Sequence, residues 1–395
     1  MSTRRPRLPV PRWSSTQPGA IGGSHPAPVG AASDVPMQAS VSGPLEDSPA
    51  GITCYGGGDR DWHREVLERC ESLRGGFEPA WWLRSSHVQN VLTVMRGEGA
   101  PPLAWDDEER LGMPDGGTVS VQWRGLGAPA GTPVLVVLHT ITGSGDGLRR
   151  FIAAVHARLG WVVAACNRRG HAGLALTAPR INTMGSTGDL RRQLEAIEAK
   201  RPGAPLYGVG VSAGSGLLVR YLGEEGAASR LRAAVALCPA YDIRDAFHFA
   251  HRGYDRYLTR KMVQFFLHRN REVLGGIEGY GACAASATMA EFHDRLFPLA
   301  GFATREEFYR ESNPMEVASD VAVPVLVINS ADDPVCVERN VHRHLGAMQR
   351  LPRMTLALTR RGGHCGFFEA LDRDETWADR AIAEYLVAAD RMLEG

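Results

Sequence analysis

Short runs of consecutive apolar residues alternate, from about residue 115 onward, with segments in which apolar residues recur at helical spacing. A continuous apolar run such as 134–139 (VLVVLH) is typical of a strand that is covered on both faces. Strands that alternate with helices in this way predict a doubly wound α/β core, a parallel sheet flanked by helices. The predicted strands are 134–139, 161–166, 205–211, 231–237, 323–329 and 354–358, and the predicted helices are 148–159, 189–200, 337–348 and 377–393.

The strand rhythm stops between residues 242 and 314, where helix-like segments rich in Phe and Tyr appear instead. This break predicts a helical cap inserted after the sixth strand. The chain then divides into a first part of the core at 61–241, the cap at 242–314 and a second part of the core at 315–395.

The first 60 residues are dominated by Pro, Gly, Ser and Ala. Such a segment buries too little apolar area to offset the entropy lost on ordering, so we predict a disordered tail over 1–60. Arginines 4, 5, 7 and 12 precede the first acidic residue, Asp34, and in this respect the tail resembles an organellar transit peptide. An Arg-biased disordered tail is the alternative. We expect a cytoplasmic or organellar protein that is not secreted.

The chain has 395 residues, of which 44% are hydrophobic and 22% charged, with a formal net charge of zero. This composition is typical of a globular protein with a large core, and it argues against nucleic-acid binding, which normally requires an excess of Lys and Arg. The seven cysteines lack C-x-x-C spacing and are odd in number, which favours reduced thiols. No apolar stretch reaches the roughly 18 residues of a membrane-spanning helix, so membrane contact is expected to be peripheral at most.

Residues 210–214 read Gly-Val-Ser-Ala-Gly, a G-x-S-x-G nucleophile elbow. The preceding apolar run 205–211 predicts a strand, and leucines at helical spacing after the motif predict a helix. A serine on a sharp turn between strand and helix needs neighbours without side chains, because the two backbone segments approach closely. Ser212 is therefore the candidate nucleophile, and a structural glycine-rich turn is the alternative.

A serine hydroxyl needs a base to take its proton and an acid to orient that base. His364 lies between glycines after the last predicted strand, and Asp332 and Asp333 follow the strand 323–329. These positions lie at the carboxyl ends of strands, where open α/β sheets bind ligands. We favour Asp333 over Asp332 because Pro334 fixes the backbone after it. Asp242 is a second-choice acid, more simply a solvated residue at the start of the cap, and His139 and His171 are assigned to loop or pocket structure.

The negative charge of a tetrahedral intermediate needs backbone N–H donors. One donor is expected from Ala213, directly after the nucleophile, and the second from Ile141 in the loop 139–144, for which a plain turn is the alternative. The apolar cap suggests an acyl-chain pocket that includes Phe265 and Phe266 with Thr140, although these aromatic residues also fit a simple cap core. No metal-ligand cluster, phosphate loop or nucleotide fingerprint appears in the sequence, so we expect no cofactor.

With these residues the sequence resembles the α/β-hydrolase family 4, the abhydrolase-domain proteins of the embryogenesis-associated and YheT type, over about residues 77–390. The resemblance includes, beside the elbow and the Asp and His loops, Trp82-Leu83 with His87 and Gln89, the 113–117 turn, the loop 139–144, Asn167-Arg168-Arg169-Gly170 and the segment 185–190.

The resemblance implies an α/β-hydrolase fold and hydrolysis of lipid-like esters, because animal members act as acylglycerol lipases or phospholipases. Its triad falls on Ser212, Asp333 and His364. One position departs from the family pattern: His139 is followed by Thr140 in place of the usual glycine, and a side chain there narrows the loop or changes its backbone angles.

The first hypothesis is a serine carboxylesterase or lipase that acts on a small-molecule ester or lipid through an acyl-enzyme. An acyltransferase that uses an alcohol in place of water has the same sequence features. A catalytically silent binding protein on the same fold is the third alternative; the intact Ser, Asp and His argue against it, and Thr140 argues for it. The sequence leaves the acyl-chain preference and the oligomeric state open.

Overall fold

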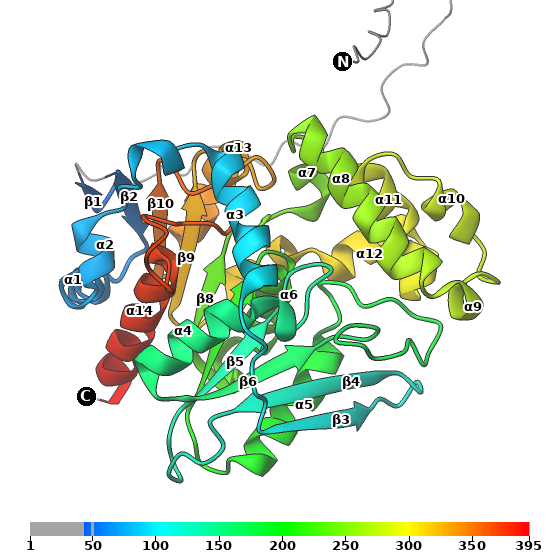
Figure 1. The fold of residues 1–395 in the computed structure, drawn as a ribbon, viewed down its shortest axis with the longest axis horizontal. Helices are drawn as coiled ribbons and strands as arrows, with labels where there is room; N and C mark the ends of the chain where they lie inside the picture. Colours follow the sequence, from blue (N-terminus) through cyan, green and yellow to red (C-terminus); the bar gives the residue numbers. More distant parts are fainter. Residues whose placement is uncertain (1–42, 49–50, 395) are drawn as a thin grey trace, which may run out of the picture. The chain divides into compact units, whose positions relative to one another are not determined.

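A single mixed sheet forms the centre of the computed structural model, and helices pass in front of it in the view of Figure 1. The structure describes residues 43–48 and 51–394. Within them, ten strands are ordered β1-β2-β10-β9-β8-β7-β5-β6-β4-β3. The strands from β10 to β6 in this order are mutually parallel, and β1, β2, β4 and β3 pair antiparallel at the two ends. The strands are β1 (Glu46–Ser48), β2 (Ile52–Gly56), β3 (Asp107–Gly112), β4 (Thr118–Arg124), β5 (Val134–Leu138), β6 (Val162–Asn167), β7 (Leu206–Val211), β8 (Leu231–Leu237), β9 (Val325–Ser330) and β10 (Met354–Thr359).

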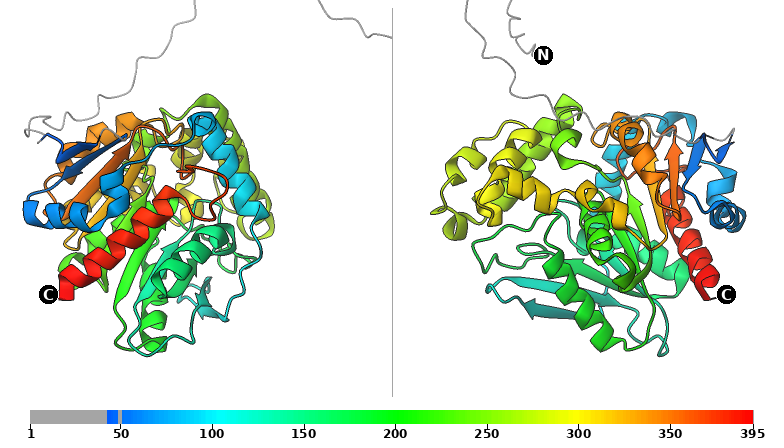
Figure 2. Two further views of the ribbon diagram at one scale, coloured as in Figure 1. Left: turned by 60° about the vertical axis from the view of Figure 1, so that its left-hand side comes forward. Right: turned by 180° about the vertical axis from the view of Figure 1, so that it is seen from behind.

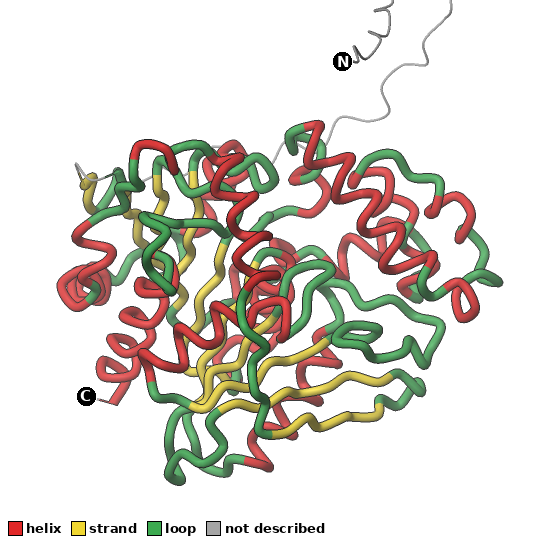
Figure 3. The backbone as a smooth tube through the Cα atoms, viewed as in Figure 1, coloured by secondary structure: helices red, strands yellow, loops and turns green. Residues whose placement is uncertain are grey.

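Helices connect the strands and cover both faces of the sheet (Figure 3). The α-helices are α1 (Arg60–Arg69), α2 (Glu71–Gly75), α3 (Ser86–Gly99), α4 (Arg149–Leu159), α5 (Thr187–Lys200), α6 (Ala213–Glu225), α7 (Ile243–Ala246), α8 (Arg252–Met262), α9 (Arg271–Leu274), α10 (Tyr280–Ala284), α11 (Met289–Arg295), α12 (Arg305–Ser312), α13 (Glu338–Met348) and α14 (Trp377–Glu394). Short 3-10 helices are η1 (Trp81–Leu83), η2 (Asp146–Leu148), η3 (Gly226–Ala228), η5 (Phe297–Ala300), η6 (Pro314–Glu316) and η7 (Ala318–Asp320), and the π-helix η4 (Val263–His268) continues α8.

Successive residues of each central strand point to opposite faces of the sheet, and each face has its own apolar core. Leu135 and Val137 of β5 pack on the face covered by α1, α4 and α14, and Val134, Val136 and Leu138 pack on the face covered by α5, α6 and α13. Figure 2 shows α14 and α4 lying across one face. Because both faces are buried, these strands are apolar throughout, as their sequences predicted. The predicted bounds of the strands and helices agree with the structure to within two residues.

The register of the parallel strands places the important loops side by side. Leu138, the last residue of β5, pairs with Gly210 of β7 and with Cys166 of β6. The loops that follow these three strands therefore leave the sheet at the same edge, as parallel strands require. The loops after β9 and β10 leave at that edge too, because Ser330 pairs with Thr359.

The segment between β8 and β9 contains α7 to α12 and no strand, and it lies beyond this edge of the sheet (Figure 1). Its side chains form a third apolar core, which includes Phe292 and Phe308 and which continues onto Ala213 at the start of α6. The strand before it, β8, is the sixth counted from β3 and the eighth in the described chain. The sequence predicted the cap after the sixth strand. The N-terminal strands β1 and β2, which that count did not include, make β8 the eighth.

The prediction of a disordered tail over 1–60 is wrong for its last part. Ile52–Gly56 form β2, which pairs antiparallel with β10, and Ile52 and Cys54 are buried. The alternation of apolar side chains in this short strand was obscured by the surrounding Gly and Pro residues. Residues 1–42 and 49–50 lie outside the described residues. In the part that is described, no helix is long and apolar enough to cross a bilayer.

Candidate active site

Ser212 sits on a sharp turn between β7 and α6. Its φ angle is 54°, a region that non-glycine residues rarely adopt, and its amide donates a 2.8 Å hydrogen bond to the carbonyl of Leu237. A Cβ on Gly210 would overlap the backbone of Ser215, and one on Gly214 would overlap the carbonyl of Leu138. Both glycines of the elbow are thus required by the close approach of neighbouring backbone, as the motif predicted.

The imidazole of His364 hydrogen-bonds to both predicted partners. Its Nε2 lies 2.9 Å from Oγ of Ser212, and its Nδ1 lies 2.8 Å from Oδ2 of Asp333. The loop that carries it is fixed at two points: the amide of His364 donates to Oδ1 of Asn90 on α3 at 2.7 Å, and Oγ of Ser330 donates to the carbonyl of Gly363 at 2.7 Å. Three residues from distant parts of the sequence therefore form one hydrogen-bonded chain.

The two adjacent aspartates have different partners. Oδ1 of Asp333 accepts hydrogen bonds from the amides of Val335 and Cys336, at 2.7 and 2.9 Å, which leaves Oδ2 for the imidazole. Asp332 instead accepts from the amide of Gly363 at 2.9 Å and so holds the His364 loop. Asp242, the second-choice acid, caps the N-terminus of α7 by accepting from the amide of Arg244.

Burial and charge act in opposite directions on the pKa of His364. Burial of the ring is the largest single effect and lowers this pKa, but Asp333, Cys365 and Cys336 together outweigh burial and raise the pKa well above its ordinary value. Burial likewise raises the pKa of the Asp332 carboxyl. The arrangement resembles the Ser-His-Asp constellation in geometry: an imidazole accepts from a hydroxyl on one side and is oriented by a carboxylate on the other.

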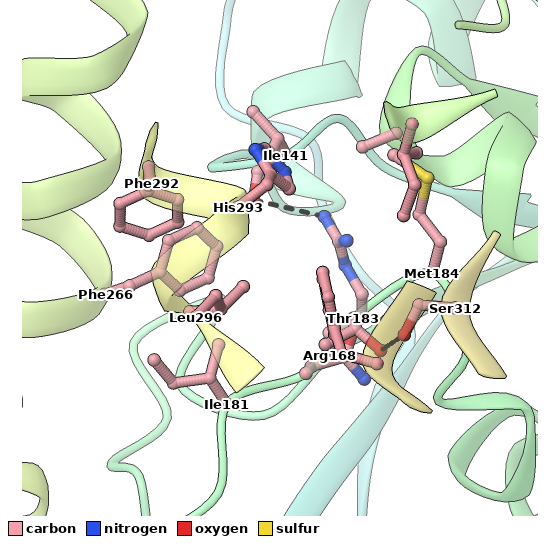
Figure 4. A pocket seen from close by; sticks show the side chains of 14 residues that line it. Ile141, Arg168, Ile181, Thr183, Met184, Phe266, Phe292, His293, Leu296 and Ser312 are labelled. Atoms are coloured by element: carbon pink, nitrogen blue, oxygen red, sulfur yellow. Dashed lines mark hydrogen bonds between the residues drawn. The ribbon is translucent and has the colours of Figure 1, made fainter. Parts of the chain in front are cut away.

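A narrow cavity lies between the elbow and the cap (Figure 4). Its volume is about 30 Å³, room for about two water-sized groups. Ala213 and Ile141, the two predicted oxyanion donors, both line it. The amide of Ala213 is in the first turn of α6, where a helix leaves N–H groups without intrahelical partners. The apolar lining residues are Ile141, Ile181, Met184, Ala213, Ile243, Phe266, Phe292, Leu296 and Phe308, and the polar ones are Arg168, Asn182, Thr183, His293 and Ser312.

Two of the predicted substrate-binding residues do not line this cavity. Phe266 does, but Phe265 packs on the ring of His171 with centroids 4.7 Å apart, and Arg269 lies 5.5 Å from its centroid. Thr140 is also outside the lining, and its carbonyl accepts hydrogen bonds from the side chains of His139 and Arg168. Consecutive helical residues point in different directions, which explains why Phe265 and Phe266 separate.

His139 and His171 have structural partners, as predicted. Their rings lie 4.6 Å apart, and Nδ1 of His171 donates to the carbonyl of Gly143 at 2.7 Å. Burial, and then the charge of Arg168, lower the pKa of both rings well below the ordinary value, so both are neutral at pH 7. Neither ring is bonded to Ser212.

Three thiols gather around His364, which the sequence pattern did not indicate. Cys238, Cys365 and His364 offer ligand atoms within 4.8 Å of one another, and so do Asp333, Cys336 and His364. Both sets use the imidazole that already bonds Ser212 and Asp333, so a metal there would compete with that hydrogen-bonded chain. All seven cysteines are free thiols.

Sequence reasoning also missed the roles of Arg168 and Asn90. Arg168 lies within, and Asn90 directly after, a motif that supported the family resemblance but was given no role in the site. Arg168 directly follows β6 at the carboxyl edge of the sheet, and that position is the signal that would have marked it.

The fold and this constellation define an α/β-hydrolase. The sequence matches the family model Hydrolase_4, described as serine aminopeptidase, S33, over residues 132–370. Human protein ABHD15 is 30% identical over 343 residues, which cover 81% of this chain and 69% of the relative. Mouse phospholipase ABHD3 is 26% identical over 345 residues, 84% of this chain and 83% of the relative.

Medium-chain fatty acid ethyl ester synthase/esterase 2 of Saccharomyces cerevisiae is 30% identical over 291 residues, 66% of this chain and 63% of the relative. Among solved structures, a Staphylococcus aureus protein of unknown function aligns with a TM-score of 0.50 and 14% identity, over 72% of this chain and 99% of that one, a likeness of fold alone. The chain belongs to the Hydrolase_4 family of α/β-hydrolases, as a member of the abhydrolase-domain type. Its enzyme class is carboxylic ester hydrolase.

Proposed function

We propose that this protein hydrolyses lipid-like carboxylic esters through an acyl-enzyme on Ser212. The observation that carries the proposal is the hydrogen-bonded chain from Ser212 Oγ through His364 to Asp333, at 2.9 and 2.8 Å. The reactive form of the enzyme has a neutral imidazole whose Nδ1–H donates to the Asp333 carboxylate. This tautomer leaves the Nε2 lone pair directed at the serine hydroxyl.

The proposed reaction has two halves. The Ser212 oxygen attacks the ester carbonyl while its proton moves to His364 Nε2, and the resulting imidazolium gives that proton to the leaving alcohol. Water then attacks the acyl-enzyme with the same imidazole as base, which releases the carboxylic acid. The amides of Ala213 and Ile141 are proposed to donate to the oxyanion in both halves.

A lipid-like ester is supported by the lining of the cavity. Aromatic and aliphatic side chains such as Phe266, Phe292 and Leu296 form most of its wall, and buried CH₂ groups gain about 0.8 kcal/mol each in such surroundings. The mouse relative is named a phospholipase, which agrees with this class of substrate. Since the cavity is narrow, we propose that a long acyl chain enters by displacing cap side chains.

The name of the yeast relative, which includes both synthase and esterase, supports acyl transfer to an alcohol as a second candidate. The chemistry differs only in whether water or an alcohol attacks the acyl-enzyme. The ratio of free acid to ethyl ester, measured with and without added ethanol, separates the two.

The test is hydrolysis of p-nitrophenyl acetate, butyrate, octanoate and palmitate by the full chain, with the p-nitroanilide of octanoic acid as the amide counterpart. We expect the octanoate ester to give the highest kcat/KM and the anilide to give little product. Hydrolysis of the anilide in preference to the ester would favour a peptidase. Preference for acetate over every longer ester would contradict the acyl-chain pocket, and no hydrolysis of any ester would contradict the proposed function itself.

A further inference from the structure

Arg168 is a buried cation in the wall of the cavity. Only 5% of its surface is exposed, and it lines the cavity together with Ala213 and Ile141. Figure 4 shows its guanidinium extending among the lining side chains toward Ile141. Within the described residues, the hydrogen-bond partners of this guanidinium are all in residues 139–141, and it forms no ion pair with an Asp or Glu. Burial of an unpaired charge is costly, so this arrangement requires an explanation.

The neighbouring residue has the opposite arrangement. Arg169 is equally buried, and its guanidinium bonds both oxygens of Asp189 at 2.7 Å and one oxygen of Asp115 at 2.6 Å. Two carboxylates thus neutralise Arg169 and none neutralises Arg168. The fold therefore places carboxylates beside Arg169, but it places none beside Arg168, which lines the cavity.

The partners of Arg168 compensate its charge only through dipoles. Its Nη2 donates to the carbonyls of His139, Thr140 and Ile141, while its buried Nε has no hydrogen-bond partner. Burial lowers the pKa of the guanidinium to about 9, so the side chain is still protonated at pH 7. The adjacent rings of His139 and His171 are neutral and add no negative charge.

Two hydroxyls add hydrogen-bond donors to the same cavity. Oγ1 of Thr183 and Oγ of Ser312 lie 3.1 Å apart, so one of their two protons is used between them and the other is free for a ligand. Arg168 and these two hydroxyls form a polar part of a cavity whose remaining lining is mostly apolar, so the polar part has donors for a small anionic group.

We propose that Arg168 binds an anionic oxygen group, a carboxylate or a phosphate, on the ester substrate. The inference rests on the proposed function, because the anion is a part of the ester that Ser212 attacks. The cavity lined by Arg168 and Ala213 then selects esters that carry a negative charge near the reacting carbonyl. Charge-assisted hydrogen bonds to a buried guanidinium are strong, which makes this contact a specificity determinant.

The test uses two pairs of esters that differ only by the charged group. Monooctanoylglycerol is compared with monooctanoylglycerol phosphate, and p-nitrophenyl hexanoate with the p-nitrophenyl monoester of adipic acid. We expect the charged member of at least one pair to have the higher kcat/KM, by roughly 10- to 100-fold. The pair that shows the preference identifies phosphate or carboxylate as the group.

Variants separate substrate binding from a role in holding the loop. In Arg168→Gln the preference for the charged ester is expected to disappear while the neutral ester is still hydrolysed, and Arg168→Lys is expected to restore part of the preference. Arg269→Gln removes an equal charge from an exposed position on the cap and should leave the preference unchanged. Equal loss of activity on both members of each pair would overturn the proposal and make Arg168 a positioning residue of the loop 139–144.

A measurement on the unmodified protein covers the case in which the Arg168 variants do not fold. Octyl phosphate and octanoate are tested as competitive inhibitors of neutral ester hydrolysis against octanol. Stronger inhibition by either anion supports the proposal. Equal inhibition by octanol, or hydrolysis of neutral esters with no preference for charge, overturns this inference alone, whereas hydrolysis of no ester overturns the proposed function as well.

Discussion

Nε2 of His364 lies 2.9 Å from Oγ of Ser212, although 152 residues separate them in the sequence. The contact depends on the parallel register that brings the loops after β7 and β10 to one edge of the sheet. It also depends on the strained backbone of Ser212, which is held by the hydrogen bond of its amide to Leu237.

Replacing Asp333 by Asn should lower kcat for a p-nitrophenyl ester by about 10⁴-fold, the order found when the orienting acid of a Ser-His-Asp triad is neutralised. The amide no longer stabilises the imidazolium or the correct tautomer. Asp332→Asn is the matched control, since that carboxyl accepts from the amide of Gly363 and is not bonded to the imidazole, and we expect a much smaller loss. A larger loss in Asp332→Asn would show that the acid has been assigned to the wrong residue.

Activity should fall at low pH as His364 becomes protonated. Burial lowers its pKa, and Asp333, Cys365 and Cys336 together raise it further than burial lowers it, so the midpoint of the acid limb of kcat/KM should lie above the ordinary histidine value. In Asp333→Asn the largest of the effects that raise this pKa is removed, so the midpoint should move to lower pH and the residual activity should persist there. A midpoint that does not move in this variant would contradict the direct charge interaction between the two side chains.

Asn90→Ala should loosen the loop that carries His364. The variant leaves the amide of His364 without its 2.7 Å acceptor, a loss of about 1–3 kcal/mol for a buried donor. We expect a lower melting temperature and a lower kcat with little change in KM. Thr93→Ala, on the same helix, removes only a hydrogen bond within α3 and serves as the control. Unchanged kcat in Asn90→Ala would mean that the loop is fixed without it.

Gly214→Ala should destabilise the protein, because the added Cβ overlaps the carbonyl of Leu138 at the end of β5. Overpacking of this kind typically costs about 1–3 kcal/mol. Gly188→Ala in α5 meets no atom within 4 Å and should leave the free energy of unfolding unchanged or raise it by up to about 1 kcal/mol. Chemical denaturation of both variants gives the comparison, and equal stability of the two would contradict the tight packing of the elbow.

The sequence predicted those parts of the fold and the site in which a residue pattern has a single physical cause. Apolar runs such as 134–138 predict buried parallel strands, and the elbow glycines predict a turn that tolerates no side chains. The order of Ser212, Asp333 and His364 along the chain then places all three residues at carboxyl ends of strands, and the structure brings them within hydrogen-bond distance.

Features that depend on distant partners were not predictable in this way. The strand β2 is stable because β10 lies beside it, which local composition does not reveal. The direction of Phe265 depends on the packing of η4 against His171. The lack of an acid near Arg168 is visible only in three dimensions, because Asp115 and Asp189, which serve Arg169, are far away in the sequence.

Labelling with a fluorophosphonate probe tests the central claim most directly, because the probe reacts covalently with a serine that is activated by a neighbouring base. The full chain should be labelled, Ser212→Ala should not, and Ser215→Ala should be labelled like the unchanged protein. Equal labelling of Ser212→Ala and the unchanged protein would contradict the assignment of Ser212 as the nucleophile.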